Sequence, residues 1–144
     1  IERGTSRGDR ATLAAARTLL ERALVAMPDD PLLQHYAGYA LYRDAVAALV
    51  DARDEKSGKQ EAGELLERAE SYLDRSAKRM PLAETQALRS SVIGMRIGVG
   101  SNPMAGMWLG PKASSAMEAA LKLGPRNPRV WLLRGTSAFN TPKA

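Results

Sequence analysis

The amino-acid sequence predicts an all-α protein of about six helices, forming one domain over residues 1–144. Apolar residues recur at three- and four-residue steps along most of the chain, which is the spacing of one helix face. Prolines interrupt these stretches at intervals, as expected between helices. Only one Phe, two Trp and four Tyr are present, so Ala, Leu, Val and Met must build most of the core. This composition favours helix on helix, because strands prefer β-branched and aromatic residues.

The composition limits the possible functions. A chain of 144 residues is long enough to bury about 70% of its unfolded surface in one core. There are no cysteines, which excludes disulfides, thiolate metal sites and thiol nucleophiles. The net charge of +5 is dispersed among acidic residues, so we expect no nucleic-acid binding. Positive charge is in local excess only near the start of the sequence, at Arg3, Arg7 and Arg10. We expect these residues to form a solvated end.

No apolar run reaches the roughly 18 residues that a membrane-spanning helix needs. The chain begins at Ile1 rather than at Met, so we expect a processed or trimmed piece of a protein. A cytoplasmic location is one expectation. The other is the periplasm, after removal of a signal peptide that is not seen in the sequence.

The helix boundaries follow from capping residues and prolines. Asp9 is a candidate N-cap for the first helix, and Pro28 ends that helix. Pro31 suits the first turn of the second helix, where its missing N–H costs nothing. The predicted helices cover about 9–27, 31–52, 60–80, 82–99, 111–123 and 128–139.

Two segments are predicted to be loops. Residues 53–59 are charged and contain Gly58, which is typical of an exposed connection. Residues 100–112 are rich in Gly and Pro, yet they hold several large apolar side chains, including Trp108. An apolar loop is unfavourable in water. It must therefore pack over a helix end or form a contact site for a partner.

The chain repeats a pattern of small, large apolar, small and proline. It occurs as Ala16-x3-Leu20-x2-Ala23-x4-Pro28, as Ala69-x3-Leu73-x2-Ser76-x4-Pro81 and as Ala113-x3-Met117-x2-Ala120-x4-Pro125. A small residue also follows ten positions after each of these prolines, at Gly38, Ser91 and Gly135. The small residues let a neighbouring helix approach closely. This arrangement resembles the tetratricopeptide (TPR) repeat, and the resemblance covers nearly the whole chain.

The resemblance implies a right-handed α–α superhelix built of antiparallel helix hairpins. Two complete units, at about 29–81 and 82–125, are longer than the usual TPR unit of about 34 residues. An unpaired helix flanks them at each end. These end helices are expected to act as caps, or to meet another copy or a continuation of the chain.

The resemblance also implies a concave groove lined by the first helix of each hairpin. The groove positions that we single out are His35, Tyr39, Tyr42 and Arg43, then Leu88, Val92, Met95 and Arg96, then Leu132 and Phe139. The Lys and Asn with which some TPR proteins grip a peptide carboxylate are missing. What remains is an apolar strip beside arginines, which suits a peptide with apolar anchors and an acidic group. The alternative is that neighbouring helices bury much of this strip.

Candidates for catalysis or cofactor binding are weak. His35 is the only histidine, and no nucleophile or metal-ligand cluster is placed to use it, so we expect a partly buried helix residue. Gly98 and Gly100 lack the third glycine and the strand of a dinucleotide site. Glu61, Glu64, Glu67 and Glu70 recur every three residues and are interpreted as a solvated helix face rather than a metal site.

The sequence therefore predicts a protein–protein interaction scaffold that is not an enzyme and needs no cofactor or metal. The partner is a protein or peptide that the sequence does not identify. The alternative is a structural or oligomerisation domain, in which the end helices complete the stack with another copy. The step from fold to role is an analogy, because a fold does not dictate a function.

Overall fold

The structure is a computed structural model that describes the backbone of residues 2–140 and the side chains of residues 10–136. Over this part of the chain there are six α-helices and no strand, which confirms the predicted all-α class. The helices are α1 (Glu2–Ala26), α2 (Pro31–Asp51), α3 (Glu55–Arg79), α4 (Ala83–Val99), α5 (Ala105–Leu123) and α6 (Pro128–Asn140). None of the helices, as far as they are described, is long and apolar enough to cross a membrane.

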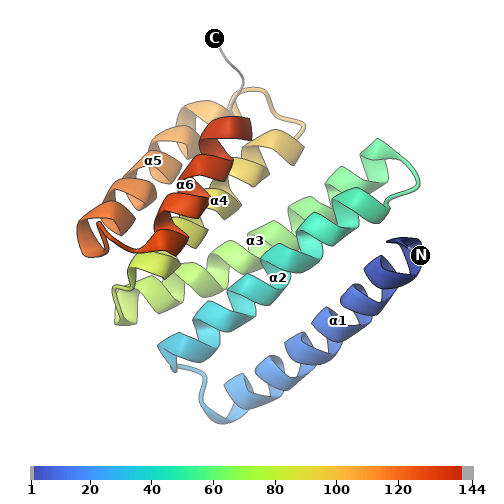
Figure 1. The fold of residues 1–144 in the computed structure, drawn as a ribbon, viewed down its shortest axis with the longest axis horizontal. Helices are drawn as coiled ribbons and strands as arrows, with labels where there is room; N and C mark the ends of the chain where they lie inside the picture. The colour runs from blue at the N-terminus through green and yellow to red at the C-terminus, as the bar shows by residue number, and fades with distance from the viewer. Residues whose placement is uncertain (1, 141–144) are drawn as a thin grey trace.

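From α1 to α5 the helices pack as successive antiparallel neighbours (Figure 1). The most extensive packing joins α2 to α3 and α4 to α5, which are the two hairpins predicted from the repeat. At one end α1 packs on α2, and at the other α6 packs on α4 and touches α5 only slightly. The packing of α3 on α4 joins the two hairpins. A right-handed superhelical winding of these pairs remains a prediction.

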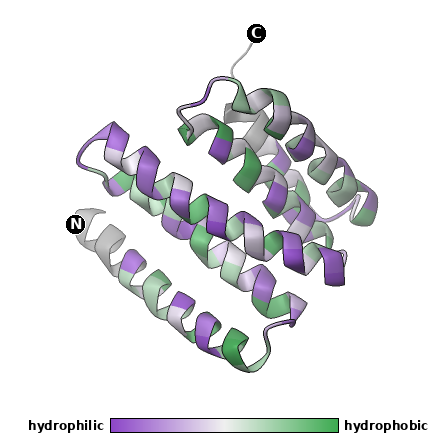
Figure 2. Cartoon of the chain, turned by 180° about the vertical axis from the view of Figure 1, so that it is seen from behind, coloured by the Kyte–Doolittle hydropathy of each residue, from purple (hydrophilic) through white to green (hydrophobic). Residues whose placement is uncertain are grey.

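The core lies between the helices in two clusters. The larger cluster draws on α2, α3 and α4, and its buried residues are Leu41, Ala45, Ala48, Ala62, Leu65, Leu66, Ala69, Leu73, Leu88 and Val92. The smaller cluster joins α4, α5 and α6 through Ala87, Ala120 and Val130. Leu133 of α6 packs against both clusters. Outside the core, the outward side of α3 is mainly hydrophilic (Figure 2).

Gly38 shows why the repeat carries a small residue in α2. A Cβ atom added at Gly38 would lie 2.6 Å from Cγ of Leu73 and 3.2 Å from the carbonyl oxygen of Ala69. Leu73 is fully buried in the larger core cluster, so it has no free space to move into. The absence of a side chain at Gly38 therefore lets α2 and α3 approach closely.

Capping explains where α2 and α3 begin. Oδ1 of Asp30 accepts hydrogen bonds from the backbone N–H groups of Leu32 and Leu33, both at 2.9 Å, as the N-cap of α2. Asp54 caps α3 by accepting the N–H of Ser57 at 2.8 Å. The helix α3 thus starts at Glu55, and the prediction that residues 53–59 form a loop is wrong over most of that range. The charged residues there form an exposed first turn instead.

Two other predicted boundaries are wrong. The helix α1 starts at Glu2 and runs through Asp9, so Asp9 is not its N-cap. The helix α5 starts at Ala105 rather than near Pro111, and Pro111 lies inside it. A proline in the second turn removes one backbone hydrogen bond, and this weakens a helix without always ending it. The predicted loop at 100–112 is therefore helical from Ala105 onward.

Candidate partner-binding surface

The outer side of α2 carries an ordered pair of side chains, Tyr39 and Arg43. Tyr39 is 41% exposed, and Nη1 of Arg43 donates a hydrogen bond to its hydroxyl group at 3.0 Å. The guanidinium carbon of Arg43 lies 5.9 Å from the centre of the Tyr39 ring, within the range of a cation–π contact. Tyr42 is half-buried against the larger core cluster, and burial raises the pKa of its hydroxyl group. The sequence placed these three residues on one surface, and the structure leaves Tyr39 and Arg43 open to solvent.

His35 lies one turn before Tyr39 and is buried. Its Nδ1 lies 2.8 Å from Oγ1 of Thr85, a residue of α4 that is fully buried. Burial lowers the pKa of His35, and the nearby carboxylate of Glu84 opposes this shift. Arg129 of α6 pairs with Glu84 at 3.2 Å. The beginnings of α2, α4 and α6 therefore converge around His35, which joins helices and is not a free contact for a partner.

The α4 positions of the predicted groove belong to the interior. Leu88 is 3% exposed and Val92 is fully buried, so neither offers a surface to a partner. Met95 is half-buried and packs against the larger core cluster. Leu88 and Val92 therefore correct the predicted apolar strip. Neighbouring helices cover the middle of this strip, because the α4 side chains fill the space between the hairpins.

Arg96, the fourth predicted α4 position, is occupied by an ion pair. Its guanidinium group contacts the carboxylate of Glu70, and Nζ of Lys112 in α5 contacts the same carboxylate. Glu70 is only 5% exposed. Burial alone raises the pKa of Glu70, but the hydrogen bonds from Lys112 and Arg96 outweigh it and the pKa lies below its ordinary value. The interpretation of Glu70 as part of a solvated face is therefore wrong.

The other three glutamates of the predicted row on α3 behave differently from Glu70. Glu61, Glu64 and Glu67 are exposed, as predicted for a solvated face. Beside Glu70 and Arg96 lies an open depression of about 360 Å³, which Asp74, Arg75 and Lys78 also line. No group of acidic or histidine side chains that could hold a metal ion exists among the described residues.

The helix α6 contributes two exposed apolar side chains. Leu132, a predicted groove residue, is 70% exposed and Trp131 is 47% exposed. The guanidinium group of Arg134 lies over the Trp131 ring at 5.1 Å, and the indole N–H donates to the carbonyl of Pro125 at 2.7 Å. This arginine–aromatic pair was not predicted, although its spacing of three residues on a helix could have indicated it. The side chain of Phe139 lies outside the described residues.

The predicted contact site around Trp108 is an exposed helical turn. Trp108 is 65% exposed, Met107 66% and Met104 51%, all at the beginning of α5. These side chains do not pack over a helix end. They lie three and four residues apart, so they share one side of the helix and form a small apolar patch.

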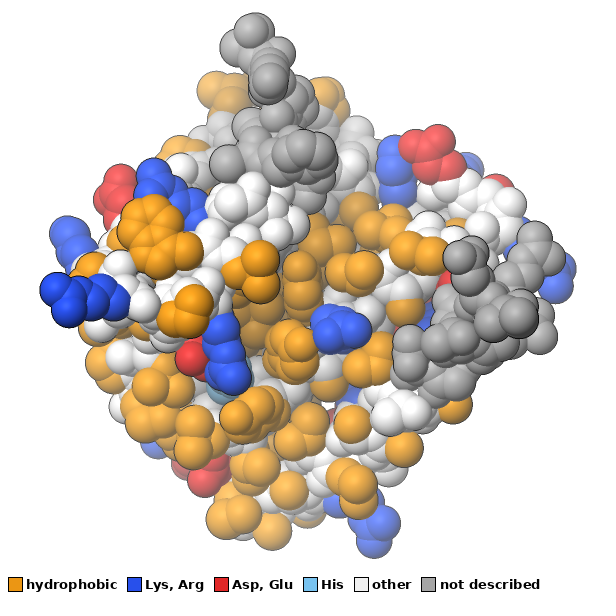
Figure 3. Space-filling model, viewed as in Figure 1, with side chains coloured by type: hydrophobic (Ala, Val, Ile, Leu, Met, Phe, Trp, Pro, Cys, Tyr) orange, Lys and Arg blue, Asp and Glu red, His pale blue; other side chains and the backbone are white. Residues whose placement is uncertain are grey.

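One face of the molecule gathers apolar side chains between α2 and α6 (Figure 3). The surface is hollowed there, and single basic side chains interrupt the apolar area. The pair Tyr39–Arg43 on α2 and the exposed Leu132 on α6 come from the two helices that border this area. We call this area the α2–α6 face.

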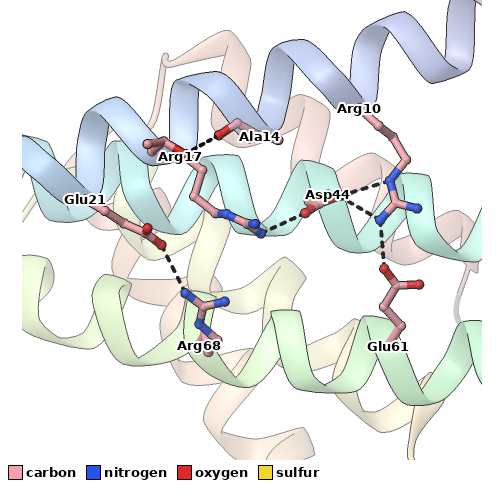
Figure 4. A network of polar contacts seen from close by, with 8 residues as sticks. Arg10, Ala14, Arg17, Glu21, Asp44, Glu61 and Arg68 are labelled. Carbon is pink, nitrogen blue, oxygen red and sulfur yellow. Dashed lines mark hydrogen bonds and ion pairs between the residues drawn. The ribbon is translucent and has the colours of Figure 1, made fainter.

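Ion pairs join the helix α1 to α2 and α3 (Figure 4). Asp44, which is 8% exposed, accepts from Arg10 at 3.1 Å and from Arg17 at 2.9 Å. Two pairs reach α3: Arg10 with Glu61 at 2.8 Å, and Glu21 with Arg68 at 3.1 Å. The expectation of a solvated Arg10 is therefore wrong, whereas the side chains of Arg3 and Arg7 lie outside the described residues. Leu24 is the one buried apolar side chain among those described in α1.

Comparisons with protein-family models, with curated proteins and with solved structures find no match for this chain.

Proposed function

We propose that this protein is a non-enzymatic scaffold that binds a segment of another protein across the α2–α6 face. The observation that carries the proposal is the Tyr39–Arg43 pair. Within the described part of the chain, Arg43 contacts no carboxylate, whereas Arg96 and Arg129 are each paired with one. Arg43 is thus a cation that the Tyr39 side chain holds in place and that is available to an acidic group of a partner.

The chemistry of this face favours a partner with apolar anchors and a carboxylate. Exposed aromatic residues and arginine are the side chains that contribute most to binding energy at protein interfaces. Tyr39 and Leu132 supply apolar contacts at the two borders of the face, and Arg43 supplies charge. The buried state of His35 and its bond to Thr85 favour a structural role for it over a catalytic one.

A selection of peptides from a random library, followed by calorimetry, tests the proposal. We expect the selected peptides to carry acidic and apolar residues. Binding should weaken at least about tenfold in Tyr39→Ala/Arg43→Ala, because a fully engaged aromatic or arginine anchor contributes more than about 2 kcal/mol. Arg43→Lys keeps the positive charge but loses the planar donor geometry of arginine, so its affinity shows which of the two properties the peptide needs.

Val50→Ala is the matched control. Val50 is 73% exposed on the same helix, about 16 Å from Tyr39 along its axis, and its truncation should leave binding unchanged. Equal binding by the wild type and by Tyr39→Ala/Arg43→Ala would contradict the proposal. It would direct attention to Met107 and Trp108, where a further double alanine variant can be measured in the same assay.

A second candidate function is a structural domain in which α6 of one copy packs on α1 of another. The exposed apolar residues of both end helices favour it, namely Leu132 on α6 and Val25 on α1. We rank it second because the exposed charges meet unfavourably: α6 presents Arg129 and Arg134, and α1 presents Arg22. Mass measurement by light scattering tests it, since such head-to-tail contacts do not close and must give masses that grow beyond a dimer.

A further inference from the structure

The side of α1 that points away from α2 is apolar, although it faces water. We call it the outer face of α1, and its exposed residues among those described are Ala11, Thr12, Ala14, Ala15, Thr18, Leu19, Arg22, Val25 and Ala26. Leu19 is 65% exposed and Val25 is 85% exposed. The exposed side of α3, by comparison, is made mostly of Glu, Arg and Lys. A solvated helix face is normally polar, so an apolar one indicates an interaction surface.

Polar groups on the outer face of α1 are few or already satisfied. Arg22 is its only charged side chain within residues 10–26, because Arg17 and Glu21 turn toward the body and pair with Asp44 and Arg68. The hydroxyl group of Thr18 donates to the carbonyl oxygen of Ala14 at 3.0 Å, within its own helix. Thr18 can therefore be covered without leaving its donor unpaired.

Side-chain size is distributed unevenly along this face. The first half carries the small residues Ala11, Ala14 and Ala15 beside Thr12, and the second half carries the larger Leu19, Arg22 and Val25 before Ala26. When an identical helix lies antiparallel on this face, the half with large side chains of each copy contacts the half with small side chains of the other. A parallel helix would bring large onto large and leave space between the alanines. The face is thus complementary to itself in the antiparallel sense, which is what a two-fold contact requires.

Charge does not oppose this occupant. In the antiparallel arrangement Arg22 lies over residues 11–15 of the other copy, so the two Arg22 side chains are about 10 Å or more apart along the helix. That separation exceeds the Debye length of about 8 Å at physiological salt, so their repulsion is largely screened. The aliphatic stem of Arg22 can cover an alanine while its guanidinium group stays in water. The helix α6, with its exposed arginines, has no acidic group to meet on this face.

We propose that two copies of this chain associate through the outer faces of α1, antiparallel about a two-fold axis. The contact runs over residues 11–26, about 24 Å of helix. A contact of one helix pair is smaller than the standard interface of about 800 Å² per partner. The dimer is therefore weak and depends on concentration. It uses a different helix from the α2–α6 face and does not rest on the function proposed for that face.

Sedimentation equilibrium of the whole chain, from about 10 µM to about 1 mM, tests the proposal, because a weak interface dissociates in this range. We expect the mass to rise from monomer toward dimer and no further. Ala15→Lys places a positive charge opposite Arg22 of the other copy and should weaken dimerisation about tenfold or more. Ala15→Lys/Arg22→Glu turns that repulsion into attraction and should restore the dimer.

Three comparisons keep the test specific. Ala15→Glu adds a side chain of similar size to lysine but of opposite sign, and should dimerise more tightly than Ala15→Lys. Position 15 is exposed, so circular dichroism should show equal helix content in all variants. Leu132→Glu on α6 should leave the dimer intact. A monomer at every concentration, a dimer that Ala15→Lys does not weaken, or a dimer lost in Leu132→Glu would each overturn the proposal.

Discussion

Nδ1 of His35 lies 2.8 Å from Oγ1 of Thr85, and this hydrogen bond links α2 to α4 across the two hairpins. Both residues are buried, so each polar group needs the other. Apart from this region α2 and α4 scarcely touch, because α3 carries most of the packing between the hairpins. The pair therefore contributes directly to the relative position of two helices that border the candidate binding face.

Stability should fall when His35 takes up a proton. Burial lowers the pKa of His35 below its ordinary value of 6.5, so the unfolded chain binds this proton more readily than the folded chain does. The contribution to the free energy of unfolding is fully present above about pH 6.5 and is lost as the pH falls through the folded-state pKa. Urea denaturation between about pH 7.5 and about pH 5 measures the slope.

The variant His35→Gln removes the titrating group and keeps a polar side chain. Its stability should vary less with pH in the same range than that of the wild type. Glu70, the other buried group with a shifted pKa, titrates below its ordinary value of 4.5 and does not interfere in this window. An unchanged slope in His35→Gln would show that another group causes the pH dependence.

Glu70→Gln should destabilise the fold by about 2 kcal/mol, because it leaves Arg96 with no charged partner and Lys112 with only the longer contact to Asp74 at 3.6 Å, at a partly buried site. Glu67→Gln is the control, since Glu67 is exposed and surface changes usually cost less than about 0.5 kcal/mol. Chemical denaturation of both variants at neutral pH provides the measurement. Equal stabilities would mean that the cluster at Glu70 does not hold α3, α4 and α5 together.

Asp44→Asn should loosen α1 without unfolding the rest of the chain. The substitution removes the charge that accepts from both Arg10 and Arg17, which is worth about 1 to 2 kcal/mol for charged hydrogen bonds. Amide hydrogen exchange in residues 10–26 should become about tenfold faster, while exchange in α4 stays the same. Asp29→Asn, which disrupts the exposed pair with Arg79, should have no such effect on α1.

Gly38→Ala and Gly94→Ala should change stability in opposite directions. At Gly38 the new methyl group would overlap Leu73, and such overpacking costs about 1 to 3 kcal/mol. At Gly94 no atom lies within 4 Å of the new Cβ, so alanine should stabilise α4 by about 0.5 to 1 kcal/mol through helix propensity. Thermal denaturation of the two variants compares them. A stable Gly38→Ala would mean that α2 and α3 can separate at little cost.

Part of the candidate surface could be predicted from sequence because it depends on helical spacing. Tyr39 and Arg43 are four residues apart on α2, so one side of the helix presents both. Leu88 and Val92 have the same spacing on α4, and the same reasoning placed them on the surface. They are buried because α3 and α6 pack around them, and a spacing within one helix carries no information about such neighbours.

The sequence by itself determined the all-α class, the two hairpins and the close approach at Gly38, because turns, prolines and apolar periodicity are local properties of the chain. Only the tertiary structure decided that Glu70 is buried while Glu67 is exposed, and that Arg43 has no carboxylate while Arg96 has one. It also decided that Arg17 turns toward Asp44, so that Arg22 is the one charged side chain on the outer face of α1 within residues 10–26. These outcomes depend on which charges meet across helices far apart in the chain, and Coulomb interactions are set by distance in space.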